Sequence, residues 1–135
     1  MANQHFQIVI IGAGPAGMAA AVTTTKAGLE TIVIDDQKDS GGQVYRNLQA
    51  NQGKSPAYLG QSYYDGAKLA QSFADCGAIY WSDCTVWQIT DMHEIALVSR
   101  GKAELITADY IIIATGAIER PMPVKGWTLP GVMSV

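Results

Sequence analysis

Near its amino terminus the chain reads Ile8-Val-Ile-Ile-Gly12-Ala-Gly14-Pro-Ala-Gly17-Met-Ala-Ala-Ala21, an apolar run that passes through three glycines into small residues. This pattern is typical of a strand that turns into a helix and cradles a dinucleotide. Gly12 permits the reversal, Gly14 lets the backbone approach a pyrophosphate, and Gly17 lets the helix pack closely on the strand. Pro15 presets the helical φ where no N–H partner is needed. Ala16 follows in the first helical turn, whose N–H groups point at the phosphates.

The residues after this turn complete a βαβ unit. The helix is predicted to run to about Ala27 and to end at Gly28, and a second strand, Thr31–Ile34, leads into Asp35 and Asp36. Asp35 follows Gly17 at close to the spacing of ~20 residues at which a carboxylate binds ribose hydroxyls. The alternative is a glycine-rich turn that binds nothing. The surrounding strand, helix and acid favour a dinucleotide-binding unit.

Composition indicates one globular domain. The 135 residues are 48% hydrophobic and 16% charged, which excludes a disordered chain. A net charge of −3 argues against a nucleic-acid partner. The longest uncharged apolar run, residues 8–22, is too short for a membrane span, and the leader lacks the Lys and Arg of a signal peptide. A cytoplasmic protein without membrane contact is therefore expected.

The cysteines and histidines do not suggest a metal site. Cys76 and Cys84 lie too far apart for a CxxC motif, and burial as reduced thiols is the favoured interpretation. His5 and His93 are distant in sequence and have no paired ligands nearby. We expect no bound metal.

A second glycine pair follows the acids. Gly41 and Gly42 would let another backbone segment approach the cofactor at the carboxyl edge of the sheet. Gln43 comes next, and then Tyr45 and Arg46 supply an aromatic face and a cation. An ordinary surface turn is the alternative here.

The middle of the chain changes rhythm twice. Residues 47–60 have no sustained period, and a helix is predicted from Ser62, where Ser62 and Asp65 form a capping-box pattern, to Gly77. A strand at Ala78–Trp81 follows. Three short strands joined by tight turns are then predicted to form an antiparallel meander: Thr85–Thr90, in which Trp87 and Ile89 share a face, Glu94–Ser99 and Glu104–Thr107.

The last predicted strand returns to the parallel sheet. Tyr110–Thr115 is continuously apolar at its centre, which is typical of a buried interior strand. Its exit at Ala114, Thr115 and Gly116 again lies on the ligand edge. The predicted fold class is α/β, a Rossmann-like domain with a central parallel sheet and a three-stranded antiparallel β-meander.

These pieces, in this order, resemble the first part of the FAD domain of two-dinucleotide-binding flavoproteins, the superfamily of glutathione and thioredoxin reductases. More narrowly, three segments resemble the A (alpha) subunits of opine oxidases and related amino-acid dehydrogenases, which include a subunit of hydrogen cyanide synthase. The segments are Gly41-Gly-Gln-Val-Tyr-Arg46, Thr85-Val-Trp-Gln-Ile89, and Gly116-Ala-Ile-Glu-Arg-Pro121 running into Gly126–Met133.

The resemblance implies FAD as the cofactor. In that superfamily the first glycine turn holds the pyrophosphate, the acid at the position of Asp35 binds ribose, and the Gly41-Gly42 loop and the Ala-Thr-Gly turn approach the cofactor. The acid is usually Glu, so Asp35 alone does not separate FAD from NAD. Disulfide reductases with redox cysteines after the double glycine would need a Cys near Gln43, and none is present.

The resemblance also implies more polypeptide. Residues 1–120 are expected to be the amino-terminal portion of the FAD-binding domain, and residues 121–135 a linker toward a second dinucleotide-binding domain that the chain does not contain. The sheet is accordingly expected to be incomplete, and the chain to be inactive by itself.

Three functions remain open at this point. The first is the FAD-binding portion of an oxidoreductase that takes a hydride from a carbon–nitrogen bond of an amino acid or opine, with partner subunits. The second is an NAD(P)-dependent reductase or dehydrogenase. The third is a non-catalytic nucleotide-binding or assembly module. No catalytic acid, base or nucleophile is identified, and Tyr45 and Arg46 are candidates for groups near the flavin.

Overall fold

A computed structural model describes residues 4–46, 61–118, 120 and 123–132. Within these residues, two helices and six strands follow one another in the order β1 (Gln4–Ile11), α1 (Pro15–Lys26), β2 (Thr31–Ile34), α2 (Gln61–Asp75), β3 (Ile79–Trp81), β4 (Cys84–Ile89), β5 (Glu94–Ser99) and β6 (Lys102–Ile113). All six strands form one open mixed sheet in the order β3-β2-β1-β6-β5-β4. The predicted α/β fold with a parallel centre and an antiparallel meander is confirmed.

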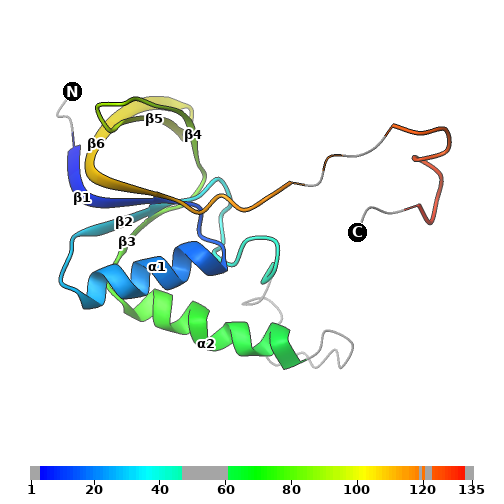
Figure 1. The fold of residues 1–135 in the computed structure, drawn as a ribbon, viewed down its shortest axis with the longest axis horizontal. Coiled ribbons are helices and arrows are strands. Elements are labelled where there is room, and N and C mark those ends of the chain that lie inside the picture. Colours follow the sequence, from blue (N-terminus) through cyan, green and yellow to red (C-terminus); the bar gives the residue numbers. More distant parts are fainter. Residues whose placement is uncertain (1–3, 47–60, 119, 121–122, 133–135) are drawn as a thin grey trace.

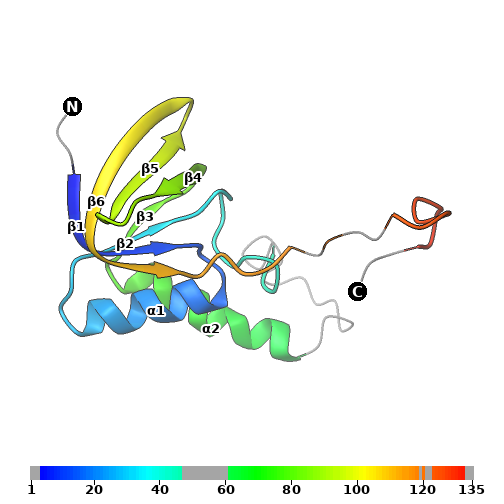
Figure 2. The same cartoon turned by 45° about the horizontal axis from the view of Figure 1, so that its top comes forward.

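The molecule is layered. Both helices cover one face of the parallel strands, and β4, β5 and the first half of β6 curl over the opposite face (Figure 1). Turning the molecule shows β6 bending from this meander into the plane of β1 and β2 (Figure 2). The described residues 123–132 form turns that project away from the sheet in both views.

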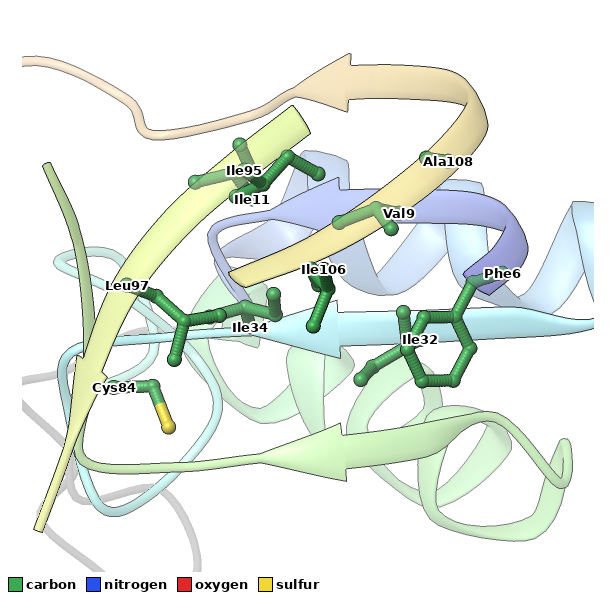
Figure 3. Close-up of a cluster of buried hydrophobic side chains, with 10 residues drawn as sticks. All are labelled: Phe6, Val9, Ile11, Ile32, Ile34, Cys84, Ile95, Leu97, Ile106 and Ala108. Carbon is green, nitrogen blue, oxygen red and sulfur yellow. The ribbon is translucent and has the colours of Figure 1, made fainter. Parts of the chain in front are cut away.

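Strand β1 is buried on both faces of the sheet. From Ile8 to Ile11 its side chains alternate between two buried clusters, because successive residues of a strand point to opposite faces. Val9 and Ile11 enter the cluster between the sheet and the meander, which Figure 3 shows, whereas Ile8 and Ile10 enter the cluster beneath the helices. A strand buried on both sides reads as a continuous apolar run, which is how residues 8–11 appear in the sequence.

Strand β6 corrects one prediction. Glu104–Thr107 and Tyr110–Thr115 are not two strands but parts of a single strand that ends at Ile113. Its first half pairs antiparallel with β5 as far as Thr107, and its second half pairs parallel with β1 from Ile106 onward. The polar residues near Asp109 do not break the strand, because hydrogen bonds to β1 take over where those to β5 end.

The predicted burial of the last strand is partly wrong. Tyr110 and Ile113 are 68% and 67% exposed. Beyond Ala108, β1 is the only partner of β6 among the described strands. This half of β6 therefore has one hydrogen-bonded neighbour rather than the two of an interior strand.

Three local predictions also need correction. Ser62 is not the helix cap, since α2 already includes Gln61. The alternation along β4 is interrupted, because the register shifts between Val86 and Gln88 and leaves Trp87, 60% exposed, without a partner on β5. His5 belongs to β1 rather than to a leader, and its ring contacts Thr107 and Asp109 on β6.

The hairpin between β5 and β6 matches the sequence prediction. Arg100 and Gly101 both have positive φ, at 50° and 75°, as a two-residue hairpin turn requires. Among the described helices none is long and apolar enough to cross a membrane.

Candidate dinucleotide-binding site

The site lies where the strand order reverses. From β1 the chain moves to β2 on one side, and β6 lies on the other side of β1. The carboxyl ends of β1 and β6 meet there, and the Ala114 N–H donates to the Ile11 carbonyl at 2.8 Å. Open α/β sheets bind ligands at such a switch point.

At Gly12 and Gly17 the first glycine turn leaves no room for a side chain. Gly12 has a φ of 103°, and a Cβ there would lie 2.8 Å from the Ala114 carbonyl carbon. A Cβ on Gly17 would collide with the Gly12 backbone, lying 2.9 Å from its carbonyl carbon. Each glycine is therefore required by backbone atoms and not only by conformational preference. Both structural roles predicted from the sequence are met.

The start of α1 is left open for an anion. Gly14 is the N-cap, offers no side-chain cap, and is followed by Pro15 without any acidic residue in the first turn. The Gly14 carbonyl accepts its first helical bond from Met18 at 2.9 Å. The N–H groups of Ala16 and Gly17 precede that bond and so have no intrahelical acceptor. A diphosphate would complete this helix terminus.

Asp35 is tied to the same turn. It is 9% exposed, and one carboxylate oxygen accepts the Ala13 N–H while the other accepts the Gln37 N–H at 2.7 Å. The end of β2 is thereby held against the glycine turn. Asp36 is exposed beside it, and its carboxylate accepts the Gln37 side-chain amide at 3.0 Å.

A second backbone segment closes over the first. The Gly41 N–H donates to the Ala13 carbonyl at 2.8 Å. Gly42 has a φ of 59°, and a Cβ there would lie 2.9 Å from the Gly14 Cα. The two glycine segments thus touch backbone to backbone, and a side chain at position 42 would separate them.

A cavity of about 470 Å³ lies over these elements. Twelve of the predicted site residues line it: Gly12, Gly14, Pro15, Ala16, Asp35, Asp36, Gly42, Gln43, Arg46, Ala114, Thr115 and Gly116. Gly17 and Gly41 support the wall from behind rather than lining it. Tyr45 does not line the cavity, and its place near the flavin stays a prediction.

Four lining residues were not predicted: Gln37, Val44, Ala117 and Ile118. Gln37, Val44 and Ala117 each lie next to a predicted residue, and Ile118 follows Ala117, so their position along the chain was the available signal. Ile118 is 90% exposed.

Among the described residues no group of three or more His, Cys, Asp or Glu side chains could hold a metal ion.

The end of the cavity that Asp35 and Asp36 line is acidic. The pKa of the Tyr80 hydroxyl is raised well above its usual value. The main cause is that the Tyr80 side chain is half-buried, and the second is the negative charge of four nearby carboxylates, those of Asp35, Asp39, Asp83 and Asp36. Asp35 and Asp36 also line the cavity, and their negative charge disfavours a phosphate group at this end. The charge pattern suits a ribose with free hydroxyls, as in FAD or NAD, better than a 2′-phosphorylated one.

Known proteins are similar to this chain in sequence and in fold. The chain is 41% identical to the A subunit of opine oxidase from Agrobacterium tumefaciens (strain Ach5), a match that covers 98% of this chain and 28% of that protein. It is 35% identical to the hydrogen cyanide synthase subunit HcnB of Pseudomonas aeruginosa over 93% of this chain and 27% of that protein. The chain therefore spans about a quarter of the length of these curated relatives.

The fold recurs in the crystal structure of L-proline dehydrogenase from P. horikoshii, with a TM-score of 0.67 and 21% identity over 89% of this chain and 24% of that one. The family model for pyridine nucleotide-disulphide oxidoreductases matches residues 6–134. The glycine cradle and the acid at its edge fit a dinucleotide. The chain therefore belongs to the pyridine nucleotide-disulphide oxidoreductase family, and membership of this family supports FAD as its cofactor.

Proposed function

We propose that this chain is the FAD-binding portion of an oxidoreductase that oxidises the carbon–nitrogen bond of an amino acid or opine. The observation that carries the proposal is the 41% identity to the A subunit of an opine oxidase over nearly the whole chain. The likeness to a hydrogen cyanide synthase subunit supports the same chemical class. FAD would supply the hydride acceptor, and the protein would bind and orient it.

The proposed roles of the site residues follow the contacts. The open N-terminus of α1, with Gly14, Ala16 and Gly17, would bind the pyrophosphate. Asp35 and Asp36 would face the adenosine ribose. Asp35 is already held by two backbone N–H groups, so its remaining lone pairs are oriented before the ligand arrives.

The other end of the cavity would receive the flavin side of the cofactor. Gly42, Gln43 and Arg46 line the cavity from one side. Ala114, Thr115 and Gly116 line it from β6. Arg46 would add a positive charge to this wall of the cavity.

The organisation of the complete enzyme is part of the proposal. Residues 1–120 would be the cofactor-binding unit, and residues 121–135 would lead toward a second dinucleotide-binding domain. The relatives are named as subunits, which supports action together with partner subunits. We also propose a cytoplasmic location.

The test is a dye-reduction assay with the chain in the context of its full-length protein and partner subunits. Opines and amino acids are offered with an artificial electron acceptor, and the corresponding 2-hydroxy acids serve as matched substrates that have a C–O bond at the same carbon. The proposal expects reduction with the C–N substrates alone. Reduction by NADH without any amine would favour a reductase, and no turnover with any donor would favour a binding module.

A further inference from the structure

The Tyr45 side chain lies against helix α2 instead of facing the cavity. The ring is partly buried and packs on the hydrophobic cluster beneath the helices. Its neighbour on α2 is Gly66: a Cβ there would lie 2.5 Å from Tyr45 Cδ1 and 2.6 Å from Cζ. Any residue with a side chain at position 66 would therefore collide with the ring.

Gly66 is not explained by its backbone. It lies within α2 and is not among the glycines with positive φ. A glycine in the interior of a helix destabilises it relative to alanine. The space that Gly66 leaves for Tyr45 is the feature of the structure that offsets this cost.

A second contact from the same helix holds the next residue. The Tyr63 hydroxyl donates to the Arg46 carbonyl at 2.9 Å. Tyr63 and Gly66 are three residues apart and so lie on one face of α2. This face therefore binds two successive residues, Tyr45 and Arg46, at the end of the 41–46 turn.

The other end of the 41–46 turn is bound to the first glycine turn. The Tyr45 N–H donates to the Gly41 carbonyl at 3.1 Å, and the Gly41 N–H donates to Ala13 at 2.8 Å. A Cβ on Gly41 would lie 2.6 Å from the Tyr45 carbonyl oxygen. Gly42, in turn, lies against Gly14. A continuous series of contacts therefore connects α2 with the first glycine turn.

We infer that Gly66 is a positioning residue for the cofactor site: by admitting the Tyr45 ring, it lets α2 set the 41–46 turn against the first glycine turn. The inference rests on the proposed role of this cavity in binding FAD. Gly66 touches no part of the cavity itself. Its effect passes through Tyr45 and the backbone hydrogen bonds of the turn.

The experiment measures two quantities on the same variants. Amide hydrogen exchange, read by NMR without cofactor, reports the Gly41 and Tyr45 N–H groups directly. Titration with FAD reports affinity. The variants are Gly66→Ala, Tyr45→Phe, which keeps the ring, Tyr45→Ala, and the double variant Gly66→Ala/Tyr45→Ala. Ser72→Ala, on the exposed side of α2, is the matched control for helix propensity.

We expect Gly66→Ala to lower protection at Gly41 and Tyr45 by about tenfold while the amides of β1 and β2 keep theirs. FAD affinity should fall by about tenfold in parallel. Tyr45→Phe and Ser72→Ala should change neither quantity. In the Tyr45→Ala background, adding Gly66→Ala should change neither amide protection nor FAD affinity further, because the ring that the new methyl group would contact is absent.

Unchanged protection in Gly66→Ala would overturn the inference, whatever happens to FAD. Reduced protection with unchanged FAD affinity would overturn the link from the turn to the site. If the unsubstituted chain is folded but binds no FAD, the proposed function fails, and the exchange data still decide whether α2 holds the turn.

Discussion

Replacing Gly17 by alanine sets two effects of opposite sign against each other. Helix propensity alone would stabilise α1 by about 1 kcal/mol. However, the new methyl group would lie 2.9 Å from the Gly12 carbonyl carbon and 3.5 Å from the Ala114 Cβ. Favourable carbon–carbon contacts begin at about 3.5 Å, so the Gly12 backbone has to move.

The steric effect should win. Overpacking costs about 1–3 kcal/mol when side chains can adjust, and here the obstacle is backbone, which places the cost at the upper end. After the gain in propensity, we expect Gly17→Ala to lower the free energy of unfolding by about 2 kcal/mol. The strain is relieved by moving α1 away from the turn, so FAD affinity should fall by roughly tenfold or more.

Urea unfolding and FAD titration check both numbers. Thr23→Ala is the matched control, because Thr23 is exposed on the same helix and its hydroxyl donates only to the Ala19 carbonyl among the described residues. The control should change stability by no more than about 0.5 kcal/mol and leave FAD affinity intact. A Gly17→Ala protein as stable as the control, with unchanged affinity, would refute the steric reasoning.

Three further substitutions test the surroundings of the site. Asp35→Asn keeps one acceptor oxygen but turns an amide NH₂ toward the N–H of Ala13 or Gln37. Urea unfolding should therefore show a free energy of unfolding about 2 kcal/mol lower. A decrease below about 0.5 kcal/mol would contradict the two hydrogen bonds. Leu97→Ala empties a fully buried position and should cost about 2–5 kcal/mol, and an equal loss for exposed Val98→Ala would refute the assigned core face. Because folding raises the Tyr80 pKa, this hydroxyl ionises in the unfolded chain at a lower pH than in the folded one, and the free energy of unfolding should fall above pH 10. Tyr80→Phe should flatten this fall between pH 9 and 11. Identical pH profiles of stability for the two proteins would be evidence against the raised pKa.

Local patterns predicted most of the cofactor cradle. The turn from β1 into α1 and the acid after β2 lie within about thirty residues, and their spacing is dictated by one βαβ unit. The predicted site residues from Gly12 to Gly116 gather at one edge because parallel strands place their carboxyl ends together. That rule needs no knowledge of long-range contacts.

What the sequence did not show depends on such contacts. The continuity of β6 through Asp109 arises from its register with β1, a strand one hundred residues earlier. The inward position of Tyr45 depends on the missing side chain of Gly66, which no periodicity reveals. The exposure of Tyr110 and Ile113 reflects a strand that has one neighbour where its composition predicts two.

The cradle formed by Gly12, Gly14 and Gly17 is expected to hold FAD. The most direct test is the visible absorption spectrum of the purified chain, followed by titration with FAD and, separately, with NAD. We predict that flavin co-purifies or binds, that it binds in preference to NAD, and that Gly17→Ala weakens it. A chain shown to be folded by circular dichroism that prefers NAD, or binds neither nucleotide, would contradict the account.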